Sequence, residues 1–159
     1  MQLTNDAEKI IRSEGIRIGV AVSRFNQSIT DSLLQAAMGK LSACTVAVNS
    51  QDIISVPGAI EIPYALDRLA LSGKYDALVA LGCVIQGETP HFDYVCAMAQ
   101  QGVLRVMLDY HIPIGFGILT THDQKQAEQR IHVAQDAVLA ALELAALGSG
   151  KHASVSLSS

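Results

Sequence analysis

The chain of 159 residues is poor in charged and aromatic side chains and has no tryptophan. Only 16% of its residues are charged and 4% are aromatic, whereas 50% are hydrophobic. So little charge is unusual for a small monomeric domain. We therefore expect part of the surface to be buried between copies of the chain. The formal net charge of −4, without a cluster of lysine and arginine, argues against nucleic acid as a partner.

Signals for disulfides, metal centres and membrane spans are also missing. Cys44, Cys83 and Cys96 have no metal-ligand spacing and are interpreted as reduced thiols in apolar surroundings. Residues 1–15 lack the apolar segment of a signal peptide, and no window approaches the roughly 18 apolar residues of a membrane span. We expect a cytoplasmic protein without membrane contact and without a metal site. Four histidines without ligand spacing are expected to face solvent, namely His111, His122, His132 and His152.

Apolar runs alternate with helical patterns along the chain, which is typical of parallel strands joined by right-handed crossovers. We predict an α/β fold, a three-layer α/β/α sandwich with a four-stranded parallel sheet and flavodoxin-like connectivity. Ligands would then bind beyond the carboxyl ends of the strands. The predicted strands are 17–22, a short strand at 45–48 or 52–56, 76–85 and 112–119. The predicted helices run from a cap at Asn26 or Ser28 to Leu41 and over 60–71, 92–109 and 121–147.

A chain of 159 residues is predicted to form one domain. The segment 148–159 is rich in glycine and serine and is predicted to be a disordered tail. Within the fourth predicted strand, Gly115 and Gly117 would leave room for a ligand or for another backbone.

The segment from Gly87 to His91 indicates an anion-binding turn that leads into a helix. Thr89 is a favoured N-cap, and Pro90 suits the first helical position. The amides of Gly87, Glu88 and Thr89 would then point, together with the helix dipole, at a phosphate. His91 follows closely enough to move protons on a molecule held there. Taken alone, the segment fits a surface helix with an incidental histidine equally well.

Five segments occur in an order and spacing that resemble the 6,7-dimethyl-8-ribityllumazine synthase family of riboflavin biosynthesis. They are 23–30, 56–63, 80–85, 87–95 and 113–120. All five lie at or just after predicted strand ends, where the fold places ligand sites. The resemblance extends over 16–147, and it implies that these residues form the domain and that residues 1–15 are an N-terminal extension. It further implies a transferase that condenses 5-amino-6-(D-ribitylamino)uracil with 3,4-dihydroxy-2-butanone 4-phosphate. It also implies that no cofactor is needed.

The resemblance implies a site for the pyrimidine ring and its ribityl chain. An aromatic ring would stack on the pyrimidine, polar groups after the turn at Pro57 would hold the ribityl hydroxyls, and backbone groups of the third strand would meet the pyrimidine edge. Without the resemblance, Phe25 fits core packing and Glu61 fits a solvated acid at a helix start. The residues implied are Phe25, Ala59, Ile60, Glu61, Val84, Ile85 and, from a neighbouring subunit, Phe116.

The resemblance also implies the phosphate site and the catalytic group. His91 would transfer protons, with Asp136 as its possible hydrogen-bond partner. Arg130 of a neighbouring subunit would pair with the phosphate, although an isolated arginine in this context fits a surface ion pair as well. The remaining phosphate-binding residues implied are Gly87, Glu88 and Thr89.

The chain departs from the family pattern at three places. Ile60 stands where many members have an aromatic residue, and Gln86 stands where members usually have arginine or lysine. The glycine- and lysine-rich linker expected after Arg130 is missing. No glycine or proline lies between Gly117 and Gly148, which predicts one continuous last helix. From that helix we expect a homopentamer or a pair of pentamers rather than a capsid. The alternative is a non-catalytic lumazine- or flavin-binding or scaffold protein of the same fold.

Overall fold

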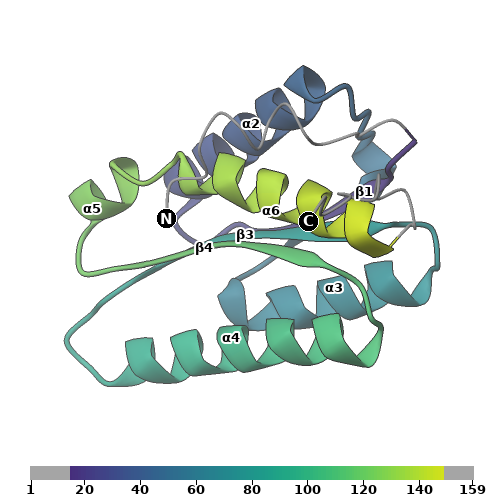
Figure 1. The fold of residues 1–159 in the computed structure, drawn as a ribbon. Helices are drawn as coiled ribbons and strands as arrows, with labels where there is room; N and C mark the ends of the chain where they lie inside the picture. Colours follow the sequence, from purple (N-terminus) through teal and green to yellow (C-terminus); the bar gives the residue numbers. More distant parts are fainter. Residues whose placement is uncertain (1–14, 149–159) are drawn as a thin grey trace, which may run out of the picture.

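The computed structural model describes residues 15–148 and arranges them in three layers (Figure 1). The middle layer consists of β1 (Ile18–Ser23), β2 (Ile53–Val56), β3 (Ala77–Ile85) and β4 (Ile114–Thr121). The strands lie in the order β2-β1-β3-β4, and all neighbouring pairs are parallel. The predicted α/β sandwich with a four-stranded parallel sheet is confirmed, and the second strand is the later of the two candidates.

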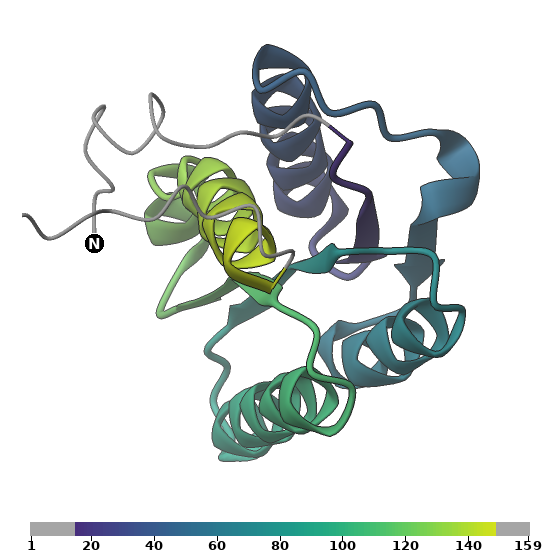
Figure 2. The ribbon, with the colours of Figure 1, turned by 45° about the vertical axis from the view of Figure 1, so that its right-hand side comes forward.

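Helices cover both faces of the sheet (Figures 1 and 2). The first face carries α2 (Gln27–Ala43), α5 (Gln124–Glu128) and α6 (Val133–Gly148), and the second carries α3 (Ile62–Leu71) and α4 (His91–Asp109). Two short 3₁₀ turns, η1 (Ser50–Asp52) and η2 (Ala59–Glu61), flank β2. Among the described residues, no helix combines the length and apolar character needed to cross a bilayer.

The central strands β1 and β3 are buried on both sides. Every residue of β1 is buried, as is every residue of β3 except Ile85. Val20 and Leu81 face the α2 and α6 layer, whereas Ala80 faces the α3 and α4 layer. Parallel sheets covered on both faces require such continuous apolar runs, which is why these two strands could be predicted from the sequence.

The glycines of β4 make room for α6 and for β3. A Cβ atom on Gly115 would lie 2.0 Å from the carbonyl oxygen of Ala137 in α6, whereas one on Gly117 would lie 2.8 Å from Leu81 Cδ2 and 3.0 Å from the Ala80 carbonyl oxygen in β3. The fourth strand therefore accommodates another backbone rather than a ligand at these positions. The contact at Gly115 sets how closely α6 approaches the sheet.

The predicted continuous helix over 121–147 is wrong. The helix α5 ends at Glu128, and α6 begins only at Val133. The intervening turn is closed by hydrogen bonds from the Arg130 amide to the Ala127 carbonyl (3.0 Å) and from the Val133 amide to the Arg130 carbonyl (3.0 Å).

Packing explains the break. The α6 helix lies along the sheet and buries an apolar face that includes Ala134 and Val138, whereas α5 buries only Ala127. Burying both segments requires a change of direction, and this tertiary demand overrides local helix propensity. Because the chain lacks that continuous helix, the fold gives no reason to expect a pentamer or a pair of pentamers rather than a capsid.

Most of the predicted N-terminal extension and of the predicted C-terminal tail lies outside the described residues. Residues 1–14 of the extension and 149–159 of the tail, including His152, lie outside the described residues. Gly148, predicted to be the first residue of the tail, is instead the last residue of α6.

Candidate active site

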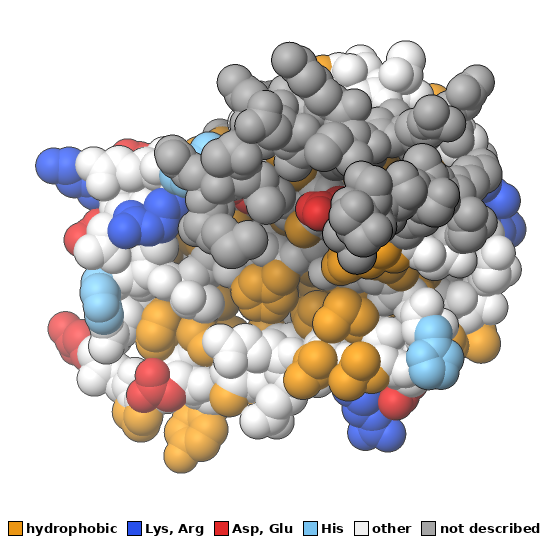
Figure 3. All heavy atoms as spheres, viewed as in Figure 1, with side chains coloured by type: hydrophobic (Ala, Val, Ile, Leu, Met, Phe, Trp, Pro, Cys, Tyr) orange, Lys and Arg blue, Asp and Glu red, His pale blue; other side chains and the backbone are white. Residues whose placement is uncertain are grey.

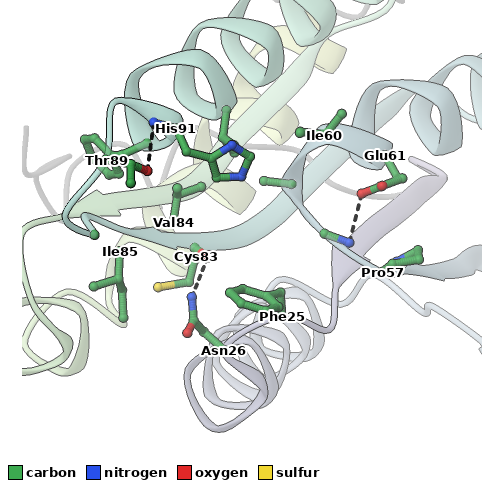
Figure 4. A pocket seen from close by; sticks show the side chains of 15 residues that line it. Phe25, Asn26, Pro57, Ile60, Glu61, Cys83, Val84, Ile85, Thr89 and His91 are labelled. Carbon is green, nitrogen blue, oxygen red and sulfur yellow. Dashed lines mark hydrogen bonds between the residues drawn. The ribbon is translucent and has the colours of Figure 1, made fainter.

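A cavity of about 380 Å³ opens at the carboxyl ends of β1 and β3, bordered by η2 and the start of α4 (Figure 4). Its volume lies within the roughly 300–1,000 Å³ typical of small-molecule sites. The residues that line the cavity come from four of the five segments that carry the family resemblance. The residues of the expected site that line the cavity are Phe25, Ala59, Ile60, Glu61, Val84, Ile85, Gly87, Thr89 and His91.

Phe25 stands on one side of the cavity, directly after β1 (Figure 4). Its side chain is 71% exposed, so the alternative that it fills the core is wrong. The Phe25 amide donates to the Pro57 carbonyl at 2.9 Å, which fixes the backbone at the end of the strand. An exposed ring on a restrained backbone is available to stack on a flat heterocycle.

The turn after β2 presents Glu61 at a second side of the cavity. The Glu61 carboxylate accepts a hydrogen bond from the Gly58 amide at 3.0 Å, so it stabilises its own turn, as expected for an acid at a helix start. A carboxylate can accept several hydrogen bonds at once. The remaining acceptor sites of Glu61 are free to receive hydroxyl groups from a polyol.

His91 lies across the cavity from Phe25, with Val84 and Cys83 of β3 between them (Figure 4). The α4 helix begins at His91 with Pro90 as its cap, so the prediction of Thr89 as N-cap and Pro90 as first helical residue is one position early. The Thr89 hydroxyl accepts from the His91 amide at 3.4 Å, and this local bond takes the place of a longer-range cap. A Cβ atom on Gly87 would meet nothing within 4 Å, so this backbone is open to a ligand.

The floor of the cavity is apolar. Cys83, Phe92 and Val95 contribute to it together with Val84. Burial raises the pKa of the Cys83 thiol from 9.0 to about 11. Because the thiolate is the reactive form of cysteine, Cys83 is protonated and unreactive at neutral pH.

Sequence reasoning missed several residues of the cavity. Val95 lies four residues after His91 and three after Phe92, and these spacings bring side chains to one face of a helix. The others directly adjoin predicted residues, except Pro57, which lies two residues before Ala59, so adjacency was the available signal. The missed residues are Asn26, Pro57, Gly58, Cys83, Phe92 and Val95.

Four expected residues do not line the cavity, namely Phe116, Glu88, Arg130 and Asp136. Phe116 is 39% exposed on the edge strand β4. Arg130 is exposed, and its Nη1 donates to the Gln126 carbonyl at 3.0 Å. Asp136 lies in the first turn of α6. Among the described residues, no hydrogen bond or ion pair within one chain joins His91 to Asp136 or the turn at Gly87 to Arg130.

Over residues 15–148, no group of three or more histidine, cysteine, aspartate or glutamate side chains is arranged to hold a metal ion. The polar groups that converge on the cavity are instead a carboxylate, an imidazole, a hydroxyl and the open backbone at Gly87. Such a set suits hydrogen bonding and proton transfer.

Comparison with known proteins shows the family of the chain. Residues 15–149 match the family model described as 6,7-dimethyl-8-ribityllumazine synthase. Three proteins of that name are similar to the chain. The protein from Desulfatibacillum aliphaticivorans is 50% identical over 77% of this chain and 79% of its own length.

The protein from Albidiferax ferrireducens is 46% identical over 86% of this chain and 88% of its own length. The protein from Cupriavidus metallidurans is 43% identical over 88% of this chain and 83% of its own length. Identity of this extent, together with the match of the family model over all the described residues, confirms the resemblance. The chain belongs to the 6,7-dimethyl-8-ribityllumazine synthase family, whose members are transferases of riboflavin biosynthesis.

Proposed function

We propose that this chain condenses 5-amino-6-(D-ribitylamino)uracil with 3,4-dihydroxy-2-butanone 4-phosphate to give 6,7-dimethyl-8-ribityllumazine, phosphate and two molecules of water. The observation that carries the proposal is a single cavity with Phe25 on one side and His91 on the other, in a member of this family. An aromatic surface, a polyol-binding carboxylate and a proton-transfer group are the elements that this condensation requires.

The pyrimidine substrate is assigned to the Phe25 side of the cavity. The ring stacks on Phe25, and backbone groups of Val84 and Ile85 meet its polar edge. The ribityl chain extends toward Ala59, Ile60 and Glu61, which line the cavity after the turn at Pro57. The exposed aliphatic side chain of Ile60, 36% accessible, offers a smaller contact surface than an aromatic ring.

The butanone phosphate is assigned to the turn Gly87-Glu88-Thr89 before α4. Amides at the start of a 19-residue helix attract an anion through their N–H groups and the helix dipole. Arg130 does not line the cavity of its own chain. We therefore assign the guanidinium group at the phosphate to Arg130 of a neighbouring subunit. An arginine can bind phosphate through two parallel hydrogen bonds.

The reaction then proceeds by proton transfers between two positioned reactants. The 5-amino group of the pyrimidine attacks the ketone, and loss of water gives an imine. Phosphate leaves by elimination, and the ribityl-substituted nitrogen closes the ring with loss of the second water. His91 moves the protons in these steps, while the cavity contributes by holding the two reactants together.

The assembly belongs to the proposal as well. We assign a homo-oligomer with a pentamer as its smallest unit, in which Phe116, Arg130 and Asp136 complete the site of the next subunit. Figure 3 supports buried contacts on this face, because hydrophobic side chains gather over β4 and α4. Exposed apolar residues of these elements include Tyr94, Met98, Leu104, Leu108 and Phe116. Sedimentation of the native chain as a monomer would contradict this assembly.

A cytoplasmic location completes the proposal. It is supported by the thiols of Cys83 and Cys96, which the structure does not join in a disulfide. Proteins of reducing compartments characteristically keep their cysteines in this state. Fractionation of cells that express the native chain would test the location.

The decisive experiment mixes the two substrates with the purified chain and follows the absorbance and fluorescence of lumazine. Turnover that is unchanged by a chelator is expected, since the steps require only proton transfer. A lumazine- or flavin-binding protein would bind the product without forming it, and a scaffold would do neither. Absence of turnover with both substrates saturating would refute the proposal.

A further inference from the structure

A hydrogen bond joins two exposed side chains that carry no role in the site described above. The Nδ1 of His122, just after β4, bonds to Oε1 of Gln86, just after β3. An amide oxygen can only accept, so Nδ1 carries the hydrogen. The backbones after β3 and β4 are also joined here, because the backbone N–H of Gln86 donates to the Thr121 carbonyl at 2.9 Å.

The hydrogen bonds continue from His122 to Arg130. The His122 amide donates to the side-chain oxygen of Gln126 at 2.9 Å. The backbone N–H of Gln126 donates to the Asp123 carboxylate at 2.8 Å. The backbone carbonyl of Gln126 accepts from Arg130 Nη1 at 3.0 Å. Residues 122–130 therefore form one hydrogen-bonded unit that ends in the guanidinium group of Arg130.

On its other side, the pair borders the turn assigned to phosphate. Gln86 directly precedes Gly87, and all residues from Gln86 to His91 are exposed. The side-chain bond described within this turn, from the His91 amide to Thr89, is long at 3.4 Å. A short exposed segment with few contacts of its own opens easily. The contact with His122 thus restrains the turn at the end where it leaves the sheet.

We propose that Gln86 and His122 are positioning residues for the phosphate-binding half of the site. Their hydrogen bond fixes the turn Gly87-Glu88-Thr89 relative to the segment that carries Arg130. The inference rests on the proposed function, which assigns both groups to the phosphate. In a ring of subunits, each phosphate site consists of the turn Gly87-Glu88-Thr89 of one subunit and Arg130 of its neighbour. A substitution that breaks the bond between Gln86 and His122 is present in every subunit, so it loosens both the turn and the arginine at each site.

The test compares three substitutions of His122. Asparagine places an N–H donor close to the position of Nδ1, whereas glutamine places it further out and alanine removes it. We expect His122→Ala and His122→Gln to raise KM for the butanone phosphate about two- to tenfold, the effect of losing one hydrogen bond. His122→Asn should restore the parent value. In all three, kcat and KM for the pyrimidine should stay unchanged.

Two further variants complete the design. Gln86→Ala should match His122→Ala, and the double variant should be no worse than either single one, because both remove the same bond. His111→Asn is the control: His111 is an exposed histidine with a positive φ of 51°, which asparagine tolerates. It precedes β4, at the opposite end of the sheet, and should behave as the parent.

A second readout separates this inference from the proposed function. Amide hydrogen exchange of residues 87–89, measured without substrates, should be faster in His122→Ala and restored in His122→Asn. If the parent forms no lumazine, the proposed function fails and exchange alone decides the inference. Unchanged exchange in His122→Ala would overturn it. So would an equal rise of both KM values, or an asparagine variant that behaves like alanine, since the imidazole itself would then be required.

Discussion

The side-chain amide of Asn26 donates a hydrogen bond to the Cys83 carbonyl at 3.0 Å, and this bond joins the ends of β1 and β3 at the cavity. Asn26 has a φ of 60°, in the left-handed region that asparagine and glycine tolerate better than other residues. Because Phe25 directly precedes it, the direction of the exposed ring depends on this backbone conformation.

Replacing Asn26 should separate the effect of the bond from that of the conformation. Asn26→Gly loses only the hydrogen bond, and the free energy of unfolding should fall by about 1 kcal/mol. Asn26→Ala keeps a Cβ in the left-handed region but loses the polar side chain with which asparagine tolerates it, for a total loss of about 2–3 kcal/mol. Urea unfolding measures both. Equal losses in the two variants would show that the conformation of Asn26 is not a source of strain.

Gly115→Ala should be among the most destabilising single substitutions. The added methyl group would lie 2.0 Å from the Ala137 carbonyl oxygen, and a backbone atom of α6 cannot move aside as a flexible side chain can. We expect a loss of at least about 3 kcal/mol. Gly39→Ala is the matched control, because a Cβ there meets nothing within 4 Å and should stabilise α2 by about 0.5–1 kcal/mol. A similar thermal midpoint for both variants would contradict this account.

Much of the site could be predicted because its residues follow buried strands. The apolar runs of β1 and β3 placed Phe25 and Val84 at strand ends, and parallel strands bring their carboxyl ends to one edge. Local chemistry around Gly87 favoured an anion-binding turn no more than a surface helix start. Periodicity placed these residues at strand ends, and the family resemblance supplied their roles in a site.

The features that were missed depend on contacts between distant segments. Nothing in the sequence around Arg130 breaks a helix, and the break between α5 and α6 arises from where each helix packs. The bond between Gln86 and His122 joins residues 36 positions apart. No pattern in the sequence marks that bond, and His122 was expected only to face solvent.

His91 should be required for rate rather than for binding. His91→Asn removes the group that exchanges protons near neutral pH, and kcat should fall by about 10- to 1000-fold because positioning of the two reactants remains. Binding of lumazine, followed by its fluorescence, should change little. A variant that loses binding together with rate would indicate that His91 holds the ligand instead.

Cys83 should make the free energy of unfolding fall more steeply as the pH rises into the alkaline range. Burial raises its pKa from 9.0 to about 11, so the unfolded chain releases this proton first as the pH rises. The free energy of unfolding should therefore be unaffected by this group below pH 9 and fall between pH 9 and pH 11.

Unfolding of the parent and of Cys83→Ala across this range isolates the effect. The raised pKa values of Cys96, Tyr75 and Tyr110 lower the stability of both proteins alike. The difference in stability between the two proteins should be constant up to pH 9 and shift in favour of the variant above it. Parallel curves up to pH 11 would show that the thiol is not desolvated.

Arg130→Ala should raise KM for the butanone phosphate far more than KM for the pyrimidine, because the guanidinium is assigned to the anion alone. Arg130→Lys keeps the charge but not the paired hydrogen bonds, so it should recover only part of the loss. Steady-state kinetics with each substrate varied in turn measures the ratio. An equal change in both KM values would remove Arg130 from the phosphate site.

Mixed oligomers would then show which subunit each Arg130 serves. Subunits with His91→Ala and subunits with Arg130→Ala are each defective alone. If Arg130 acts on the neighbouring site, random co-assembly of equal amounts places an intact His91 beside an intact Arg130 in about one quarter of the sites. Activity should therefore recover toward about a quarter of the parent value. If Arg130 instead serves its own chain, every site retains one defect, and mixing should restore nothing.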